Sequence, residues 1–273
     1  MSNPVTHAKH ADFTNLIYEV RDRIAHVTLN RPRAMNALNP ALLAELSTSL
    51  DLAVADQDVK AIVFRGAGGR AFSAGADLKH FKQKGVLDDV GDHLRFTARL
   101  RDLFLKIEQT PLPTIAVIQG YALAGGLELA MSCDFILCSD DSQIGDQHAN
   151  YGLMAGGGGT QRLPRRVGSQ RAMELLFTAR RLNGPQAVQY GLALDSFAAD
   201  RLDEGVETLL AGLRTKSRVG LGLMKSTVQR GMELPLREAL DIERLVVQEY
   251  FSCYPDAHHG IDAFNDKKRS TDH

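Results

Sequence analysis

Two junctions in the sequence have the residues needed to stabilise negative charge. Each joins an apolar strand pattern to a helix through a glycine-rich turn. The first is residues 61–81 (AIVFRGAGGRAFSAGADLKHF) and the second is residues 114–131 (TIAVIQGYALAGGLELAM). A helix start leaves backbone N–H groups unpaired, and glycine lets a ligand approach the main chain closely. Two such turns facing each other would supply the two convergent donors of an oxyanion hole. The alternative is that the glycines only allow tight turns.

Glu128 is the strongest candidate for acid–base chemistry, because it falls in the first turn of a helix expected to start near Gly125. Its neighbours at 127 and 129–131 are all apolar. Buried carboxylates are rare unless they are paired or functional. The helix start would favour the ionised form, and apolar burial would oppose it. The alternative is a glutamate that merely caps the helix.

Three other motifs match known sites only in part. Gly66–Ala71 fits G-x-G-x-x-A, but no helix follows it directly, as a dinucleotide site requires. Ser73 lies eight residues after Arg65, too far along the loop for a nucleophile elbow. Gly156–Gly159 lacks the Lys-Ser/Thr of a phosphate-binding loop, and we interpret it as a flexible or closely packed turn.

The composition excludes several other classes of function. The chain has 273 residues, 44% of them hydrophobic, so it can bury a core. It has 32 Lys and Arg against 33 Asp and Glu, a net charge of −1, which argues against nucleic acid as the main partner. Cys133, Cys138 and Cys253 form no disulfide framework, lack the spacing of a zinc site and indicate a reducing compartment.

No segment of the sequence indicates a membrane protein. Residues 1–15 lack the apolar stretch of a signal peptide and are interpreted as a loose polar arm. The longest apolar stretch, 114–131, contains Glu128 and several glycines, which suit a lipid-facing helix poorly. We therefore expect a cytoplasmic protein that does not bind membranes.

Short apolar runs alternate with helical patterns, which predicts an α/β fold. Strands are expected within 16–29 and at 61–65, 114–118 and 134–139. Helices are expected at 40–54, from 77, at 92–109, from 125, at 160–167, at 169–179 and from 184. Beyond residue 200 only helices are expected, at 201–215, 219–230, 235–252 and 255–268. This helical region, 201–273, is expected to pack on its own body or on a neighbouring subunit.

Several motifs in order resemble those of the crotonase, or enoyl-CoA hydratase/isomerase, superfamily, and the resemblance covers nearly the whole chain. They are VTLNRP at 27–32 with NAL at 36–38, AFSAGADLK at 71–79, QGYALAGGLELA at 119–130, CD at 133–134, GGGGTQRLP at 156–164, AF at 263–264 and DKK at 266–268.

The resemblance implies a spiral core of ββα units in residues 1–200, followed by a helical region that forms homotrimers or homohexamers. It implies an acyl-CoA thioester as the substrate, as in fatty acid metabolism, with no metal and no cofactor beyond the coenzyme A of the substrate. The N–H groups of Ala76 and Gly125 would hold the thioester oxygen. The resemblance also implies substrate-binding residues, which are Ala74, Asp77, Leu78, Lys79 and, at a coenzyme A phosphate, Lys267 or Lys268.

The main departure from the family pattern is at the second catalytic glutamate of the hydratases. Glu128 matches the first glutamate, but His148 stands where the second is expected. Histidine exchanges protons near neutral pH. His148 is therefore expected either to replace the glutamate or to hold the substrate by a hydrogen bond. Asp146 would share a face with His148 on a strand, but not on a helical turn.

The expected activity is that of a lyase, an enoyl-CoA hydratase acting through an enolate that the oxyanion hole stabilises. Three alternatives remain: a double-bond isomerase, a hydrolase of thioester or carbon–carbon bonds that uses His148, and a non-catalytic acyl-CoA-binding protein.

Overall fold

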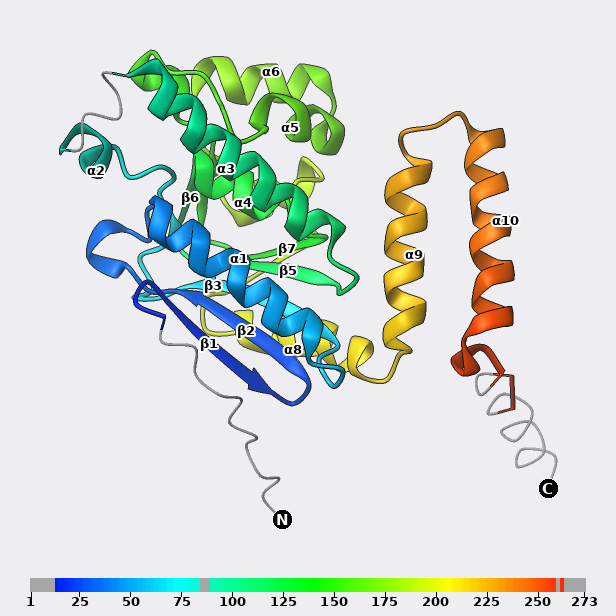
Figure 1. Ribbon diagram of the computed structural model, residues 1–273. Coiled ribbons are helices and arrows are strands. Elements are labelled where there is room, and N and C mark those ends of the chain that lie inside the picture. The colour runs from blue at the N-terminus through cyan, green and yellow to red at the C-terminus, as the bar shows by residue number, and fades with distance from the viewer. Residues whose placement is uncertain (1–12, 84–88, 259–260, 263–273) are drawn as a thin grey trace. The chain divides into compact units, whose positions relative to one another are not determined.

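The computed structural model describes residues 13–83, 89–258 and 261–262, and the chain divides into two compact units (Figure 1). The first unit comprises residues 1–108 and 114–214, and the second comprises 109–113 and 215–273. The expected N-terminal arm therefore lies almost entirely outside the described residues. None of the described helices is long and apolar enough to cross a membrane.

The first unit is built on two sheets. The larger has the strand order β1-β2-β3-β5-β7-β9, in which β1 and β2 are antiparallel and all other neighbours are parallel. Its strands are β1 (Leu16–Arg21), β2 (Ile24–Leu29), β3 (Ala61–Gly66), β5 (Thr114–Ile118), β7 (Phe135–Ser139) and β9 (Asp195–Phe197). The smaller, all-parallel sheet consists of β4 (Ala71–Ser73), β6 (Tyr121–Leu123) and β8 (Gln143–Gly145).

The chain passes through both sheets in a repeating order. The pairs β3–β4, β5–β6 and β7–β8 each place their first strand in the larger sheet and their second in the smaller one. A helical segment follows each pair before the next begins. This is the expected spiral of ββα units, so the predicted α/β fold class is confirmed.

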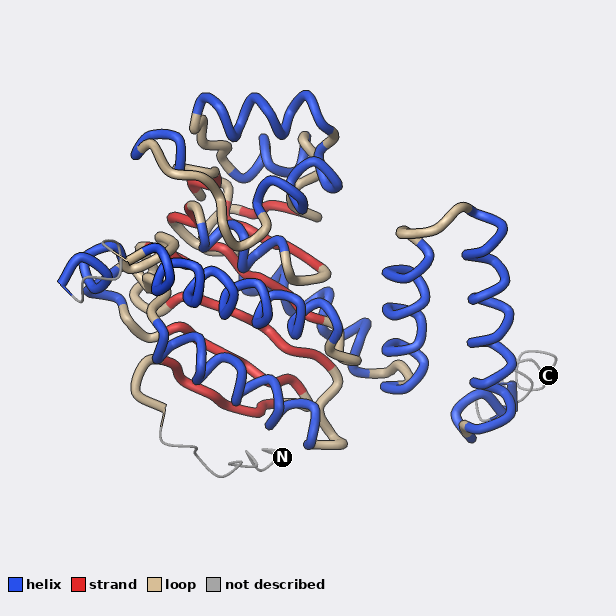
Figure 2. Tube along the Cα trace, turned by 45° about the horizontal axis from the view of Figure 1, so that its top comes forward, coloured by secondary structure: helices blue, strands red, loops and turns tan. Residues whose placement is uncertain are grey.

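Helices cover the larger sheet on its two faces. Figures 1 and 2 show α1 and α3 side by side over the strands, and α1 packs on β1 and β2. Another helix, α8, packs on β3, β7 and β9 and places Val206 and Leu210 against a buried cluster that includes Val63, Ile115 and Val117. Each such side chain contributes about 1.5–3 kcal/mol when fully buried. The helices of this unit are α1 (Pro40–Ala55), α2 (Leu78–Gln83), α3 (Val90–Gln109), α4 (Gly125–Met131), α5 (Gly159–Val167), α6 (Ser169–Thr178), α7 (Gly184–Gln189) and α8 (Leu202–Arg214), with short 3-10 turns η1 (Pro32–Ala34) and η2 (His148–Tyr151).

Helix boundaries follow local signals in the sequence. At α1, the side chain of Asn39 accepts a hydrogen bond from Leu42 N at 2.9 Å, and Pro40 occupies the first helical position. At α7, Asn183 and Gln186 form a reciprocal capping box. These caps explain why the helix starts expected at residues 40 and 184 agree with the structure.

The second unit contains a helical hairpin of α9 (Arg218–Gly231) and α10 (Leu236–Cys253). Helix α10 buries none of its residues. Large apolar side chains of the hairpin helices are exposed, and they are Met224, Val228, Leu236, Leu240, Leu245, Val247 and Phe251. The final expected helix, 255–268, falls largely outside the described residues.

Candidate active site

The two glycine-rich junctions meet at the ends of neighbouring strands. Strands β4 and β6 pair in parallel, so the turns that follow them lie at the same edge of the small sheet. A Cβ added at Gly125 would lie 3.5 Å from the Ala76 nitrogen, and a Cβ added at Gly75 would lie 3.0 Å from the Gly125 nitrogen. The backbone nitrogens of Ala76 and Gly125 are therefore near one another, as the sequence predicts.

These two N–H groups remain available to a ligand. Within the described part of the chain, no hydrogen bond is donated by Ala76 N or Gly125 N, although Leu38 pairs with the same turn on both sides of Ala76. Gly125 opens α4 directly after Ala124, whose φ of 49° and ψ of −119° are unusual for a residue with a side chain. Gly75 has a φ of 93°, which favours glycine. The strained turn thus presents two donors that have no acceptor among the described residues.

Glu128 lies in the first turn of α4 and is 1% exposed. Its Oε1 atom accepts hydrogen bonds from Gly157 N at 2.9 Å and from Gly159 N at 2.7 Å. Burial raises the pKa of this carboxyl, and it outweighs the two N–H donors and the nearby His148, which lower it. The carboxylate is held by a distant loop, so helix capping does not account for its position.

His148 begins η2, three residues after the end of β8 at Gly145, and pairs with Asp146. Its Nδ1 lies 2.9 Å from Asp146 Oδ2 and 3.0 Å from Oδ1, and its backbone N donates to Oδ1 at 3.0 Å. Asp146 stands between the strand and the 3-10 turn, so its carboxylate reaches forward to cap the turn and hold the ring. Asp146 and His148 lie neither on one strand nor on one helical turn, so their pairing comes from the junction between β8 and η2.

The carboxylates near His148 oppose the effect of burial on its pKa. Burial alone would lower the pKa of the imidazole, but Asp146 and then Glu128 outweigh it, and the pKa is raised. Gly159 lies between Glu128 and Asp146, the partner of His148, because a Cβ added at Gly159 would lie 3.1 Å from Glu128 Oε1 and 3.4 Å from Asp146 Oδ2. The structure therefore brings together the acid–base residues that the sequence singled out.

Asp77, expected to bind substrate, is engaged by the protein itself. Its carboxylate pairs with Arg31 Nη2 at 2.7 Å and accepts from His80 N at 3.0 Å at the start of α2. Burial alone would raise the pKa of Asp77, but these hydrogen bonds outweigh it and lower the pKa. A role in shaping the turn after Ala76 was not foreseen from the sequence, in which Arg31 is 46 positions away.

The other expected binding residues differ in accessibility. Leu78 and Lys79 are exposed at the start of α2, and Ala74 is half-buried with its N–H donated to Met35 O. Lys267, like Lys268, lies outside the described residues. No group of three His, Cys, Asp or Glu side chains in the described ranges is arranged to hold a metal ion.

The glycine run at 156–159 has a function that was not foreseen from the sequence. Residues Gly157 and Gly159 donate to Glu128, and a Cβ added at Gly157 would lie 2.5 Å from Glu128 Oε2. Glycine is needed here because the main chain closes over a carboxylate. The sequence offered one signal, a run of four glycines downstream of an acid expected to be buried. No periodic pattern connects the glycine run to that acid. Ser73 is buried and its Oγ accepts from Gly75 N, in keeping with the rejection of a serine nucleophile.

Comparison with known proteins confirms the resemblance inferred from the motifs. A family model described as "Enoyl-CoA hydratase/isomerase" matches residues 19–271. A probable enoyl-CoA hydratase of Rhizobium meliloti is 37% identical over 258 residues, covering 94% of this chain and 97% of that protein. The short-chain-enoyl-CoA hydratase of Clostridium acetobutylicum is 32% identical, with the same coverage of each chain. The crystal structure of an enoyl-CoA hydratase from Bacillus anthracis has a TM-score of 0.88 at 30% identity, covering 93% of this chain and 97% of that one.

Proposed function

The chain belongs to the enoyl-CoA hydratase/isomerase family, and from this premise we propose that it is a lyase that adds water to an enoyl-CoA thioester or removes it. The observation that carries the proposal is the pair of unpaired N–H groups at Ala76 and Gly125, one helical turn from the buried carboxylate of Glu128. Hydration of a conjugated thioester needs both features, a site for an enolate oxygen and a base for water.

In this proposal the thioester oxygen lies between Ala76 N and Gly125 N. Negative charge develops on that oxygen when water adds to Cβ, so fixed donors stabilise the enolate more than the ground state. The two donors are held by the parallel pairing of β4 and β6 and do not reorganise during the reaction. Loss of one such donor typically costs about 10²–10³-fold in kcat.

Glu128 acts as the base through Oε2. Its other oxygen, Oε1, is already occupied by two backbone donors, and no donor to Oε2 is found in the described part of the chain. Oε2 takes a proton from water while the hydroxyl oxygen bonds to Cβ. The raised pKa of Glu128 makes its carboxylate a stronger base than an exposed one.

His148 supplies the proton that Cα receives. Asp146 engages Nδ1, which leaves Nε2 to carry the transferred proton. The turnover ends with a protonated Glu128 and a neutral His148, and exchange with solvent returns the starting state. Dehydration follows the same path in reverse.

We further propose that Leu78, Lys79 and Ala74 line the coenzyme A path and that Lys267 meets a phosphate, with no cofactor beyond the coenzyme A of the substrate. The exposure of Leu78 and Lys79 at the start of α2, two residues after Ala76, supports this placement. The exposed apolar face of α9 and α10 supports a homotrimer or homohexamer. Within the described residues Cys133 and Cys138 form no disulfide, which supports a reducing compartment such as the cytoplasm.

A panel of short and branched trans-2-enoyl-CoA thioesters, with product masses recorded, tests the proposal. We expect a gain of one water. An unchanged mass with a moved double bond and solvent deuterium uptake would identify an isomerase instead. Release of free coenzyme A would identify a hydrolase that uses His148, and no turnover of any thioester would leave an acyl-CoA-binding protein.

A further inference from the structure

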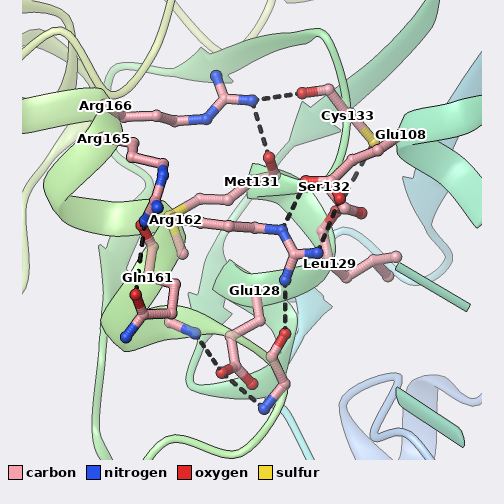
Figure 3. A network of polar contacts seen from close by, with 12 residues as sticks. Glu108, Glu128, Leu129, Met131, Ser132, Cys133, Gln161, Arg162, Arg165 and Arg166 are labelled. Carbon is pink, nitrogen blue, oxygen red and sulfur yellow. Dashed lines mark hydrogen bonds and ion pairs between the residues drawn. The ribbon is translucent and has the colours of Figure 1, made fainter. Parts of the chain in front are cut away.

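Glu128 owes its orientation to the glycine loop, residues 155–159, which is itself held from outside. Both backbone polar groups of Gly157 are hydrogen-bonded. Its N–H donates to Glu128 Oε1 at 2.9 Å, and its carbonyl accepts from Arg162 Nη1 at 2.7 Å. A single residue therefore separates the carboxylate from a guanidinium on the next helix, α5 (Figure 3). Movement of Arg162 would move the donor that orients Glu128.

The guanidinium of Arg162 is in turn fixed by α3. Its Nε and Nη2 donate to the two oxygens of Glu108 at 2.6 and 2.8 Å, and its central carbon lies 5.8 Å from the centre of the Phe104 ring. All three nitrogens of the guanidinium are thus engaged, two by the carboxylate and one by the loop. The Arg162 side chain is 14% exposed, so water screens this ion pair weakly.

The loop is shaped to receive this side chain. Gly158 has a φ of 105°, and a Cβ added there would clash with Arg162 Nη1. The main chain therefore wraps around the guanidinium at the point where it also closes over the carboxylate. A bond that only tied α5 to α3 would not require the loop to approach this closely.

We propose that Arg162 is a positioning residue for Glu128, acting through the carbonyl of Gly157 and anchored by Glu108. The inference rests on the proposed role of Glu128 as the base. Its consequence is that Oε1 stays committed to the loop and Oε2 stays directed to the reacting water. Arg162 touches neither substrate nor water in this scheme.

Arg162→Lys tests the proposal, because lysine keeps the charge but cannot form the fork to Glu108 and the bond to Gly157 O together. We expect kcat for enoyl-CoA hydration to fall by about 10- to 100-fold, since small misplacement of a catalytic group has effects of this size. KM should stay within about threefold. Loss of the Gly157 donor disfavours the carboxylate form of Glu128, so its pKa rises and the acid limb of kcat/KM moves to higher pH.

Arg166→Lys is the matched control on the same helix. Arg166 is also half-buried in α5, but its Nη2 donates to Met131 O and Cys133 O at the far end of α4, and among the described residues it forms no bond to the loop (Figure 3). We expect a lower melting temperature for this variant, with the parental kcat and acid limb. Glu108→Gln, which keeps one acceptor for Arg162, should lie between the parent and Arg162→Lys and serves as the second test if Arg162→Lys does not fold.

Two results would overturn the inference. The first is a folded Arg162→Lys or Glu108→Gln with parental kcat and an unmoved acid limb, while Glu128→Gln is inactive. The second is an equal loss of kcat in Arg162→Lys and Arg166→Lys with no change of pH profile, which would show that the ion pair only stabilises the fold. If Glu128→Gln itself is active, the proposed base is wrong, and that failure is separate from the others.

Discussion

Asp146→Asn isolates the charge that holds the proton on His148. The substitution removes the negative charge but keeps an oxygen that can cap His148 N, which donates to Asp146 Oδ1 at 3.0 Å. The charged atoms lie 2.9 Å apart, where the gross attraction is roughly 6 kcal/mol at an effective dielectric constant of about 20. Burial opposes it and is the largest single influence on the imidazole. Without Asp146, burial prevails and the pKa of His148 falls.

The expected result is a shift of the alkaline limb of kcat to lower pH. Hydration needs a protonated His148, so the variant should lose its proton donor at a lower pH than the parent does. Between the two alkaline limbs we expect a loss of up to about 10²–10⁴-fold, the contribution of a general acid. Activity should recover partly as the pH is lowered, whereas His148→Ala should not recover.

The assay follows the loss of ultraviolet absorbance as the conjugated enoyl thioester is hydrated, from pH 5 to pH 9. The charged groups that act on His148 are Asp146 and Glu128. Helix α6 also packs on η2, but its Glu174 is paired with Arg180 and Tyr190, so Glu174→Gln is the control and should leave the limb in place. A parental alkaline limb and parental kcat in Asp146→Asn would refute the reasoning.

Three further predictions follow from the same geometry. Because the pKa of His148 is raised, its pairing with Asp146 stabilises the fold below the ordinary histidine pKa, and this stability is lost as the pH rises through the raised value. Asp146→Asn should therefore lower the melting temperature more at pH 5.5 than at pH 9. An equal loss at both pH values would contradict this. Gly125→Pro removes one oxyanion donor and should abolish detectable hydration in a protein that circular dichroism shows to be folded. Light scattering at micromolar concentration should give the mass of a trimer or hexamer, and a monomeric mass would count against the role given to the exposed face of α9 and α10.

Much of the larger sheet could be predicted from the sequence, because its central strands β3, β5 and β7 are largely buried and appear as continuous apolar runs. Strand β5 agrees with the expectation at both ends. The smaller sheet was not predicted, because its strands have three residues each: β4 and β6 lie within the glycine-rich turns, and β8 lies in a segment to which no element was assigned. Such strands are too short for a periodic pattern, and only their pairing with one another reveals them.

In the candidate site, too, features with a local sequence signal could be predicted, and features that depend on long-range contacts could not. Glu128 and the turns at Ala76 and Gly125 could be found because each carries a local signal, an acid among apolar residues or glycines at a helix start. The hydrogen bonds from Gly157 and Gly159 to Glu128 join residues about 30 positions apart, so they leave no local pattern in the sequence. The pairing of Asp146 with His148 depends on where β8 ends, and sequence periodicity does not place element ends closely.

The central claim, that Glu128 and His148 together hydrate an enoyl-CoA thioester, is tested most directly by the product mass in ¹⁸O-labelled water. A short trans-2-enoyl-CoA is incubated with the parent, Glu128→Gln and His148→Ala under identical conditions. We predict that the parent forms a product heavier by one labelled water and that each variant forms it at least about 10²-fold more slowly. A parent product without the label, or a His148→Ala variant as fast as the parent, would contradict the two-residue mechanism.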